Sequence, residues 1–226
     1  MSATSAARVL NVDVVSDVVC PWCFIGKRRL ATALANLAAE QPGLDLRVNW
    51  HPFQLNPDLP PEGVDRRSYL EDKFGGPARA AQIYDRVRAA GSTVDIPFAF
   101  DRIERQPNTL DAHRLISWAQ ARGAADDVVD RLFRAYFLDG RAIGDRGVLA
   151  DIAGEAGLDR EAVRAMLASD EGVDTIRALD RRVRELGVDG VPFFIFADKV
   201  AVSGAQEPAV LKDAIAQALA DAVEAN

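Results

Sequence analysis

Residues 9–26 read VLNVDVVSDVVCPWCFIG, a β-branched run followed at once by two cysteines. The run from Val9 to Val15 is typical of a strand, and Ser16-Asp17 ends it. Pro21 costs no hydrogen bond at the first position of a helix, where it also presets the backbone angle φ. The stretch therefore predicts a strand, a turn, and a helix that begins just after Cys20.

The flanking patterns extend this unit. Leucines at helical spacing continue the helix over residues 24–40, and Pro42-Gly43 ends it. Residues 44–52 then alternate apolar and polar side chains, as a strand with one buried face does. The chain therefore opens with a β-α-β unit.

The middle of the chain, from Asn56-Pro57 to Gly187, has the apolar period of helices throughout. After it, residues 193–196 and 200–203 read as a hairpin, and a last helix follows Pro208. We expect helices in the middle near residues 66–74, 78–90, 110–122, 126–138, 146–156, 160–169 and 173–186.

Each outer piece is too small to bury both faces of a sheet, so we expect the two to share one sheet flanked by helices. The predicted class is α/β: a thioredoxin-like fold, β-α-β then β-β-α, with a large all-helical insertion. Residues 1–56 and 188–226 would form the thioredoxin-like domain, and residues 57–187 the inserted helical domain.

Composition excludes several classes of protein. Of 226 residues, 49% are hydrophobic and 27% charged, and 27 Lys and Arg against 34 Asp and Glu give a net charge of −7. This charge repels nucleic acid and anionic membranes, so we expect neither as a partner. No apolar run approaches the roughly 18 residues that span a bilayer, and none has the form of a signal peptide. We expect a cytoplasmic protein.

Cys20 and Cys23 are the only cysteines, so they cannot form a structural disulfide framework. At the helix start, free amide groups and the helix dipole favour the thiolate of Cys20. Cys23, one turn further, would lie deeper. We therefore expect Cys20 to attack and Cys23 to resolve a mixed disulfide.

Two alternatives exist for this cysteine pair. The spacing is also half of a zinc site, but there is no second cysteine pair, and His51 and His113 are far apart in the sequence. Inert buried thiols are the other alternative, which the spacing and the position of Pro21 disfavour. We expect no metal.

Pro192 is the second informative position. In a thioredoxin-like sheet, Gly190-Val191-Pro192-Phe193 would enter its strand beside the start of the first helix. We expect a cis Val191-Pro192 bond, with the Val191 backbone placed to pair with an extended substrate next to Cys20. The alternative is a trans proline on an edge strand.

Residues 16–26, SDVVCPWCFIG, resemble the active-site stretch of the FrnE-like branch of the DsbA family. The resemblance implies a thioredoxin fold with an inserted helical domain and thiol–disulfide oxidoreductase activity. The redox-active disulfide Cys20–Cys23 would then be the redox centre, with no separate cofactor. Nearly the whole chain takes part, through the further blocks WHPFQLNP at 50–57, NTLDAHRL at 108–115, GVPFFIF at 190–196 and VSGAQ at 202–206.

Kappa-class glutathione transferases and 2-hydroxychromene-2-carboxylate isomerases share this scaffold, but typically have serine where Cys20 stands and use glutathione. Both cysteines here favour dithiol exchange with a protein or peptide. A glutathione-dependent transferase or isomerase is the alternative, and a non-catalytic binding module is a third. Whether the protein is an oxidant, a reductant or an isomerase, and a monomer or a homodimer, stays open.

Several residues would support the cysteines. Trp22 brings no charge between them, so stabilisation of the thiolate rests on the helix end and on whatever the insertion contributes. With Pro21, it would form an apolar platform for substrate or a cover for the disulfide. Thr109 and His113 share a helix face, which the resemblance places over the cleft, to bind substrate or tune Cys20; a purely structural histidine is the alternative. We expect solvated faces at Arg28, Arg29 and Asp180-Arg181-Arg182.

Overall fold

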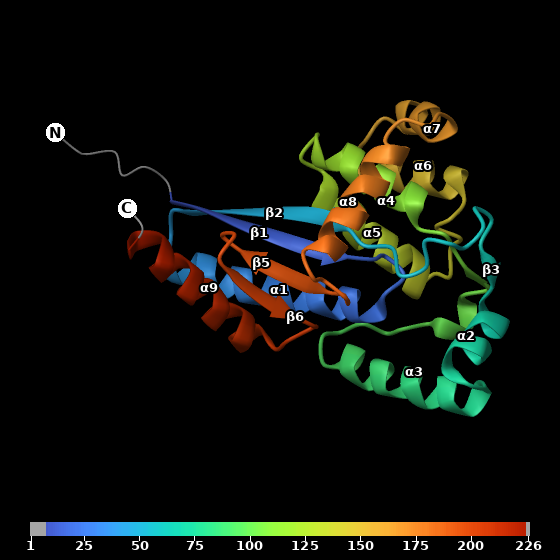
Figure 1. Ribbon diagram of the computed structural model, residues 1–226, viewed down its shortest axis with the longest axis horizontal. Coiled ribbons are helices and arrows are strands. Elements are labelled where there is room, and N and C mark those ends of the chain that lie inside the picture. Colours follow the sequence, from blue (N-terminus) through green and yellow to red (C-terminus); the bar gives the residue numbers. More distant parts are fainter. Residues whose placement is uncertain (1–7, 225–226) are drawn as a thin grey trace.

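The computed structural model describes the backbone of residues 8–224 and the side chains of residues 9–220. Its main sheet has the strand order β2-β1-β5-β6 (Figure 1). Strand β1 pairs parallel with β2 and antiparallel with β5, and β5 pairs antiparallel with β6. The prediction that the two ends of the chain share one sheet is confirmed. The strands are β1 (Arg8–Ser16), β2 (Leu44–Pro52), β5 (Phe193–Phe196) and β6 (Val200–Ser203).

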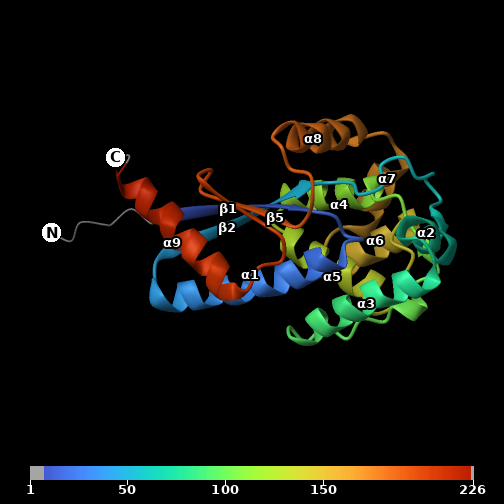
Figure 2. The same cartoon turned by 60° about the horizontal axis from the view of Figure 1, so that its bottom comes forward.

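Strand β1 is the buried centre of the sheet. Leu10, Val12 and Val14 belong to the main apolar core, while Val15 points to the other face and packs in a small cluster with Val183. Helices α1 (Pro21–Glu40) and α9 (Pro208–Glu224) lie on one side of the sheet, and α8 (Val173–Glu185) lies on the other (Figure 2). Burial on both faces at the carboxyl end of β1 accounts for the β-branched side chains of Val12, Val14 and Val15.

The inserted helices gather at the carboxyl ends of β1 and β2 (Figure 1). The main core is continuous between sheet and insertion: the rings of Phe24 in α1 and Phe133 in α5 stack with centroids 5.1 Å apart. The domain boundaries at residues 57 and 188 stay a prediction. Besides α8, the insertion holds α2 (Arg66–Phe74), α3 (Pro77–Ser92), α4 (Leu110–Gln120), α5 (Ala125–Phe137), α6 (Arg146–Glu155) and α7 (Arg160–Ala168).

The sequence predicts an all-helical insertion, but the insertion also contains two short strands. Strands β3 (Val64–Asp65) and β4 (Arg105–Gln106) pair antiparallel, and Phe100–Arg102 forms a short 3-10 helix. Strands of two residues are too short to show the alternation by which a sequence reveals a strand. The small sheet nevertheless matters, because it ties the start of α2 to the loop before α4.

The expectation of solvated faces is wrong for Arg29 and Asp180. Arg29 is 8% exposed, donates to the Ala205 carbonyl over 2.6 Å and pairs with Glu207. Asp180 is 6% exposed and accepts from the Gln54 amide over 2.8 Å. These partners are remote in the sequence, so helical periodicity cannot reveal them.

In the described part of the chain, no helix is both long and apolar enough to cross a membrane.

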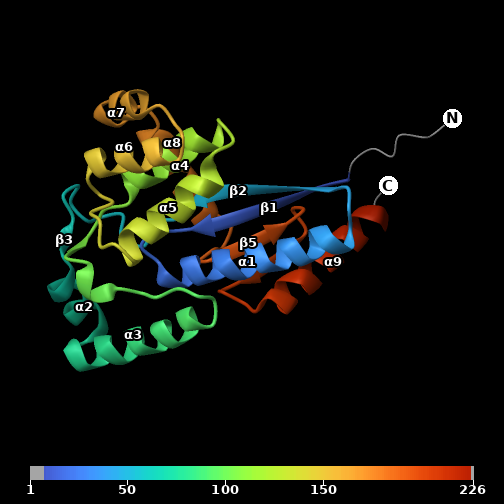
Figure 3. The ribbon, with the colours of Figure 1, turned by 180° about the vertical axis from the view of Figure 1, so that it is seen from behind.

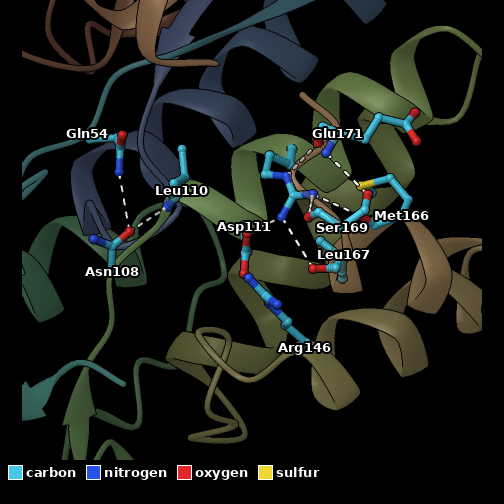
Figure 4. Close-up of polar contacts among 10 residues, drawn as sticks. Gln54, Asn108, Leu110, Asp111, Arg146, Met166, Leu167, Ser169 and Glu171 are labelled. Atoms are coloured by element: carbon cyan, nitrogen blue, oxygen red, sulfur yellow. Dashed lines mark hydrogen bonds and ion pairs between the residues drawn. The ribbon is translucent and has the colours of Figure 1, made fainter. Parts of the chain in front are cut away.

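Arg114 holds α4 to the end of α7. Its side chain is fully buried and donates to the carbonyls of Met166 and Ser169 over 2.8 and 2.7 Å. Its carboxylate partner, Asp111, also pairs with Arg146, whose side chain is 53% exposed (Figure 4). The buried guanidinium therefore adds a donor to carbonyls at the end of α7, where the helix itself leaves carbonyls unpaired.

Replacing Arg114 by Met should destabilise the protein by about 3–5 kcal/mol, because Asp111 and the α7 carbonyls lose their buried donor. Arg146→Met removes the exposed partner of the same carboxylate and should cost less than about 1 kcal/mol. Urea unfolding of both variants measures the difference. Equal losses would show that burial of Arg114 does not matter.

Candidate active site

Cys20 occupies the N-cap position of α1, without a side-chain capping hydrogen bond. It has an extended backbone, with φ −91° and ψ 113°, and Pro21 occupies the first turn of the helix. The Cys20 amide donates to the Asp17 carbonyl over 3.0 Å, and the Cys20 carbonyl accepts from the Cys23 amide over 3.0 Å. The helix therefore begins where the sequence predicts.

Both cysteines are free thiols, with Cys20 6% and Cys23 2% exposed. Burial raises the pKa of the Cys23 thiol well above its ordinary range, and its hydrogen bond with Cys20 raises that pKa further. The neighbouring Ser16 side chain and Asp17 backbone act in the opposite direction and lower the pKa of Cys23. Cys23 is thus the inner thiol, protonated at neutral pH.

The loop before β5 lies against the start of α1. The Val191-Pro192 peptide bond is cis, as predicted, and the Cys20 sulfur lies 3.6 Å from the Val191 carbonyl oxygen. Gly26 permits this approach: a Cβ atom there would lie 2.9 Å from Pro192 Cγ and 3.1 Å from Phe194 Cζ. Sequence and fold thus bring Cys20, Cys23 and Val191-Pro192 together.

A cavity of about 240 Å³ lies over Cys20. Pro21 and Trp22 line it from the start of α1, Leu55 and Asn56 line it after β2, and α2 and α3 supply most of the rest. Figure 3 shows α3 beside the first turns of α1. Trp22 is 39% exposed and lines the cavity; whether it acts as a substrate platform or as a cover for the disulfide stays a prediction. No Asp or Glu of the described residues lines the cavity, although the chain carries a net charge of −7.

Thr109 and His113 do not line the cavity over Cys20. Thr109 begins α4 and is buried. His113 is 3% exposed; its Nε2 lies 3.4 Å from Asp17 Oδ1 and faces a second cavity of about 210 Å³, which Ser16 also lines. Their assignment as substrate-binding residues stays a prediction. His51 pairs with Asp13 over 2.7 Å, outside the cavity over Cys20.

Sequence reasoning missed the residues that the insertion contributes. Arg66, 4% exposed, donates to the Tyr84 hydroxyl over 2.9 Å and to Gln106 Oε1 over 3.0 Å. Tyr84 and Gln106 line the cavity over Cys20. Arg66 directly precedes Arg67, which is exposed, and no local pattern distinguishes the two.

The loop after β2 is also held by the insertion. Asn108 accepts from the Leu110 amide over 2.9 Å and from the Gln54 side chain over 3.5 Å (Figure 4), and donates to the Leu59 carbonyl over 2.7 Å. These bonds fix the loop that carries Asn56 into the cavity.

Within the described residues, no three His, Cys, Asp or Glu side chains are grouped as metal ligands would be.

Comparisons with known proteins agree on one family. A family model described as a DSBA-like thioredoxin domain matches residues 11–216. The probable DsbA oxidoreductase SCO1869 from Streptomyces coelicolor is 32% identical, with a TM-score of 0.83 over 93% of this chain and 90% of that one. YwbO from Bacillus subtilis is 28% identical over 207 residues, 91% of this chain and 96% of YwbO. The cytosolic disulfide reductase DsbM from Pseudomonas aeruginosa, solved with GSH, shares the fold at 23% identity and a TM-score of 0.55, covering 81% of this chain and 84% of that one.

In the reduced, folded protein at neutral pH, iodoacetamide should label Cys20 and leave Cys23 unlabelled, because burial raises the pKa of Cys23 and keeps it protonated. Mass spectrometry counts the labels before and after unfolding in urea. The matched control, Cys20→Ser, should take no label until it unfolds. Labelling of Cys23 in that folded variant at neutral pH would contradict the assignment of inner thiol.

Gly26→Ala should destabilise the protein by about 1–3 kcal/mol, because the added methyl group collides with the Pro192 ring. Gly154→Ala in α6 is the control: its Cβ would lie 3.5 Å from the nearest atom, on Arg160, and it should stabilise by about 0.5–1 kcal/mol. Urea unfolding compares the two. A stabilising Gly26→Ala substitution would show that the approach of Pro192 is not tight.

Proposed function

Because the chain belongs to the DSBA-like thioredoxin domain family, we propose that it is a thiol–disulfide oxidoreductase in which Cys20 attacks and Cys23 resolves. The observation that carries the proposal is the pair of free thiols at one helix start, with Cys20 facing a cavity and Cys23 buried beneath it. The FrnE-like branch and a cytoplasmic location remain parts of this proposal.

In the reducing direction, the Cys20 thiolate attacks one sulfur of a substrate disulfide, and the other substrate sulfur leaves as a thiolate that takes up a proton. Cys23 then loses its proton and attacks the Cys20 sulfur of the mixed disulfide. The Cys20–Cys23 disulfide forms and the second substrate thiol leaves. Two electrons pass from the protein to the substrate, and the reverse sequence oxidises a substrate dithiol.

The neighbours of the two sulfurs have separate tasks in these steps. The Ser16 hydroxyl and the Asp17 amide lower the pKa of Cys23 against the effect of burial, and so stabilise the thiolate that Cys23 must become. The Val191 carbonyl, 3.6 Å from the Cys20 sulfur, marks where the backbone of an extended substrate would pair. Pro21 and Trp22 line the cavity together with Cys20.

Cys20→Ser should lower the rates of insulin reduction and of dithiol oxidation to background, because the attacking sulfur is gone. Cys23→Ser should instead accumulate mixed disulfides between Cys20 and its substrate, visible on non-reducing gels. A Cys20→Ser variant with wild-type activity would overturn the proposal. Unchanged holdase activity in a double Ser variant would favour a binding module.

The second candidate function is a glutathione-dependent transferase or isomerase. The observation that favours it is the cavity of about 240 Å³, which suits a small thiol and lacks carboxylates among the described residues that line it. DsbM, solved with GSH, has the same fold. Turnover with glutathione that survives Cys23→Ser would select this function, since only dithiol exchange needs the second sulfur.

A further inference from the structure

Behind one wall of the cavity lies a buried cation without a counter-charge. The three groups that accept from Arg66 are neutral: Gln106 Oε1 at 3.0 Å, the Tyr136 hydroxyl at 2.7 Å and the Tyr84 hydroxyl at 2.9 Å. No carboxylate among residues 9–220 pairs with it. Burying a guanidinium without a counter-charge is unfavourable, so this position calls for a negative partner.

Nearby carboxylates are engaged with other arginines. Arg66 also lines a further cavity, of about 470 Å³, to which Glu71 and Asp101 contribute. Glu71 pairs with Arg67, and Asp101 pairs with Arg88. Neither of these two carboxylates pairs with Arg66, and on its other side Tyr84 and Gln106 separate Arg66 from the cavity over Cys20.

Tyr84 connects this charge to the reacting sulfur. Its hydroxyl oxygen accepts from Arg66, which leaves its hydrogen to be donated elsewhere, and it lines the same cavity as Cys20. Burial raises the pKa of Tyr84, Arg66 lowers it, and a charge on Cys20 raises it again. Arg66, Tyr84 and Cys20 thus lie within electrostatic reach of one another.

We propose that Arg66, acting through the Tyr84 hydroxyl, is the counter-charge of the ionised Cys20 sulfur. The inference rests on the proposed dithiol exchange. Tyr84 donates its hydrogen bond to the sulfur whenever Cys20 is a thiolate, and Arg66 is the positioning residue that orients and polarises this hydroxyl. The insertion in this way supplies the positive charge that Pro21-Trp22 does not bring between the cysteines.

The consequence is a more oxidising disulfide. The proposed hydrogen bond from Tyr84 forms only when Cys20 is a thiolate, so it stabilises the reduced protein but not the disulfide. Stabilising the reduced protein makes the disulfide easier to reduce. Removing the contact should therefore leave the Cys20–Cys23 disulfide harder to reduce. It should also move the ionisation of Cys20 to higher pH.

The test is equilibration of Tyr84→Phe with mixtures of reduced and oxidised glutathione. The ratio [GSH]²/[GSSG] at which half of the protein is reduced should rise about tenfold, since a hydrogen bond to a charged group is lost. Tyr136→Phe is the matched control, because Tyr136 also bonds Arg66 but does not line the cavity. It should leave the midpoint ratio unchanged.

A second measurement is the pH dependence of Cys20 alkylation, which should shift to higher pH in Tyr84→Phe. The other ionisable groups around Cys20 are Tyr69 and Lys73, which line the cavity, and Cys23 and Asp17 beneath it; the substitution changes none of them. Arg66→Gln should raise the midpoint ratio as Tyr84→Phe does. Arg66→Lys, which keeps the charge, should not.

An unchanged midpoint in Tyr84→Phe would overturn the inference and leave the proposed function standing. The same midpoint in Arg66→Gln and Arg66→Lys would also overturn it. A wild-type protein that forms no exchangeable disulfide with glutathione mixtures would overturn the proposed function, and the inference with it.

Discussion

The contact between the first turns of α1 and the loop before β5 positions the reacting sulfur. Gly26 lets the Pro192 ring approach the helix, and the Val191 carbonyl then lies 3.6 Å from the Cys20 sulfur. Cys20 occupies the N-cap position of α1, so its sulfur lies at the helix start and next to the Val191 carbonyl. The two thiols differ in their surroundings: Cys20 lines the cavity, whereas Cys23 does not line it and is 2% exposed. That difference is consistent with an attacking and a resolving sulfur.

The sequence predicts a site residue well when the residues that reveal its position are close to it in the sequence. Cys20, Pro21 and Cys23 lie within one turn of helix, so their spacing alone places them. Pro192 is remote from them, and only the order of strands and helices, together with the family resemblance, brings it opposite Cys20. The helices and the strands of the main sheet were predictable because the periodic pattern of apolar residues that marks each one lies within its own stretch of sequence.

The remaining features depend on contacts between distant segments. Arg29 and Asp180 look like members of solvated charge runs, yet their partners Ala205 and Gln54 lie in loops that are remote in the sequence. Arg66 and Arg67 are neighbours of identical type, but only Arg66 turns inward. Since a sequence window reports charge and period but not the partner across the fold, such buried polar groups are the part that the sequence leaves undetermined.

The two parts of the chain contribute different groups to the site: the thioredoxin-like part holds the reacting sulfurs, and the insertion holds a buried positive charge. The thioredoxin-like part supplies both sulfurs and Pro192, while α2, α3 and β4 supply most of the cavity wall and, in Arg66, a buried cation. A chain with a net charge of −7 keeps carboxylates away from the described lining of this cavity. Because opposite charge stabilises an ion most where water is excluded, a cation at this depth acts more strongly on the sulfur than one at the surface would. The insertion is therefore the part of the molecule through which the reactivity of a common redox pair can be adjusted.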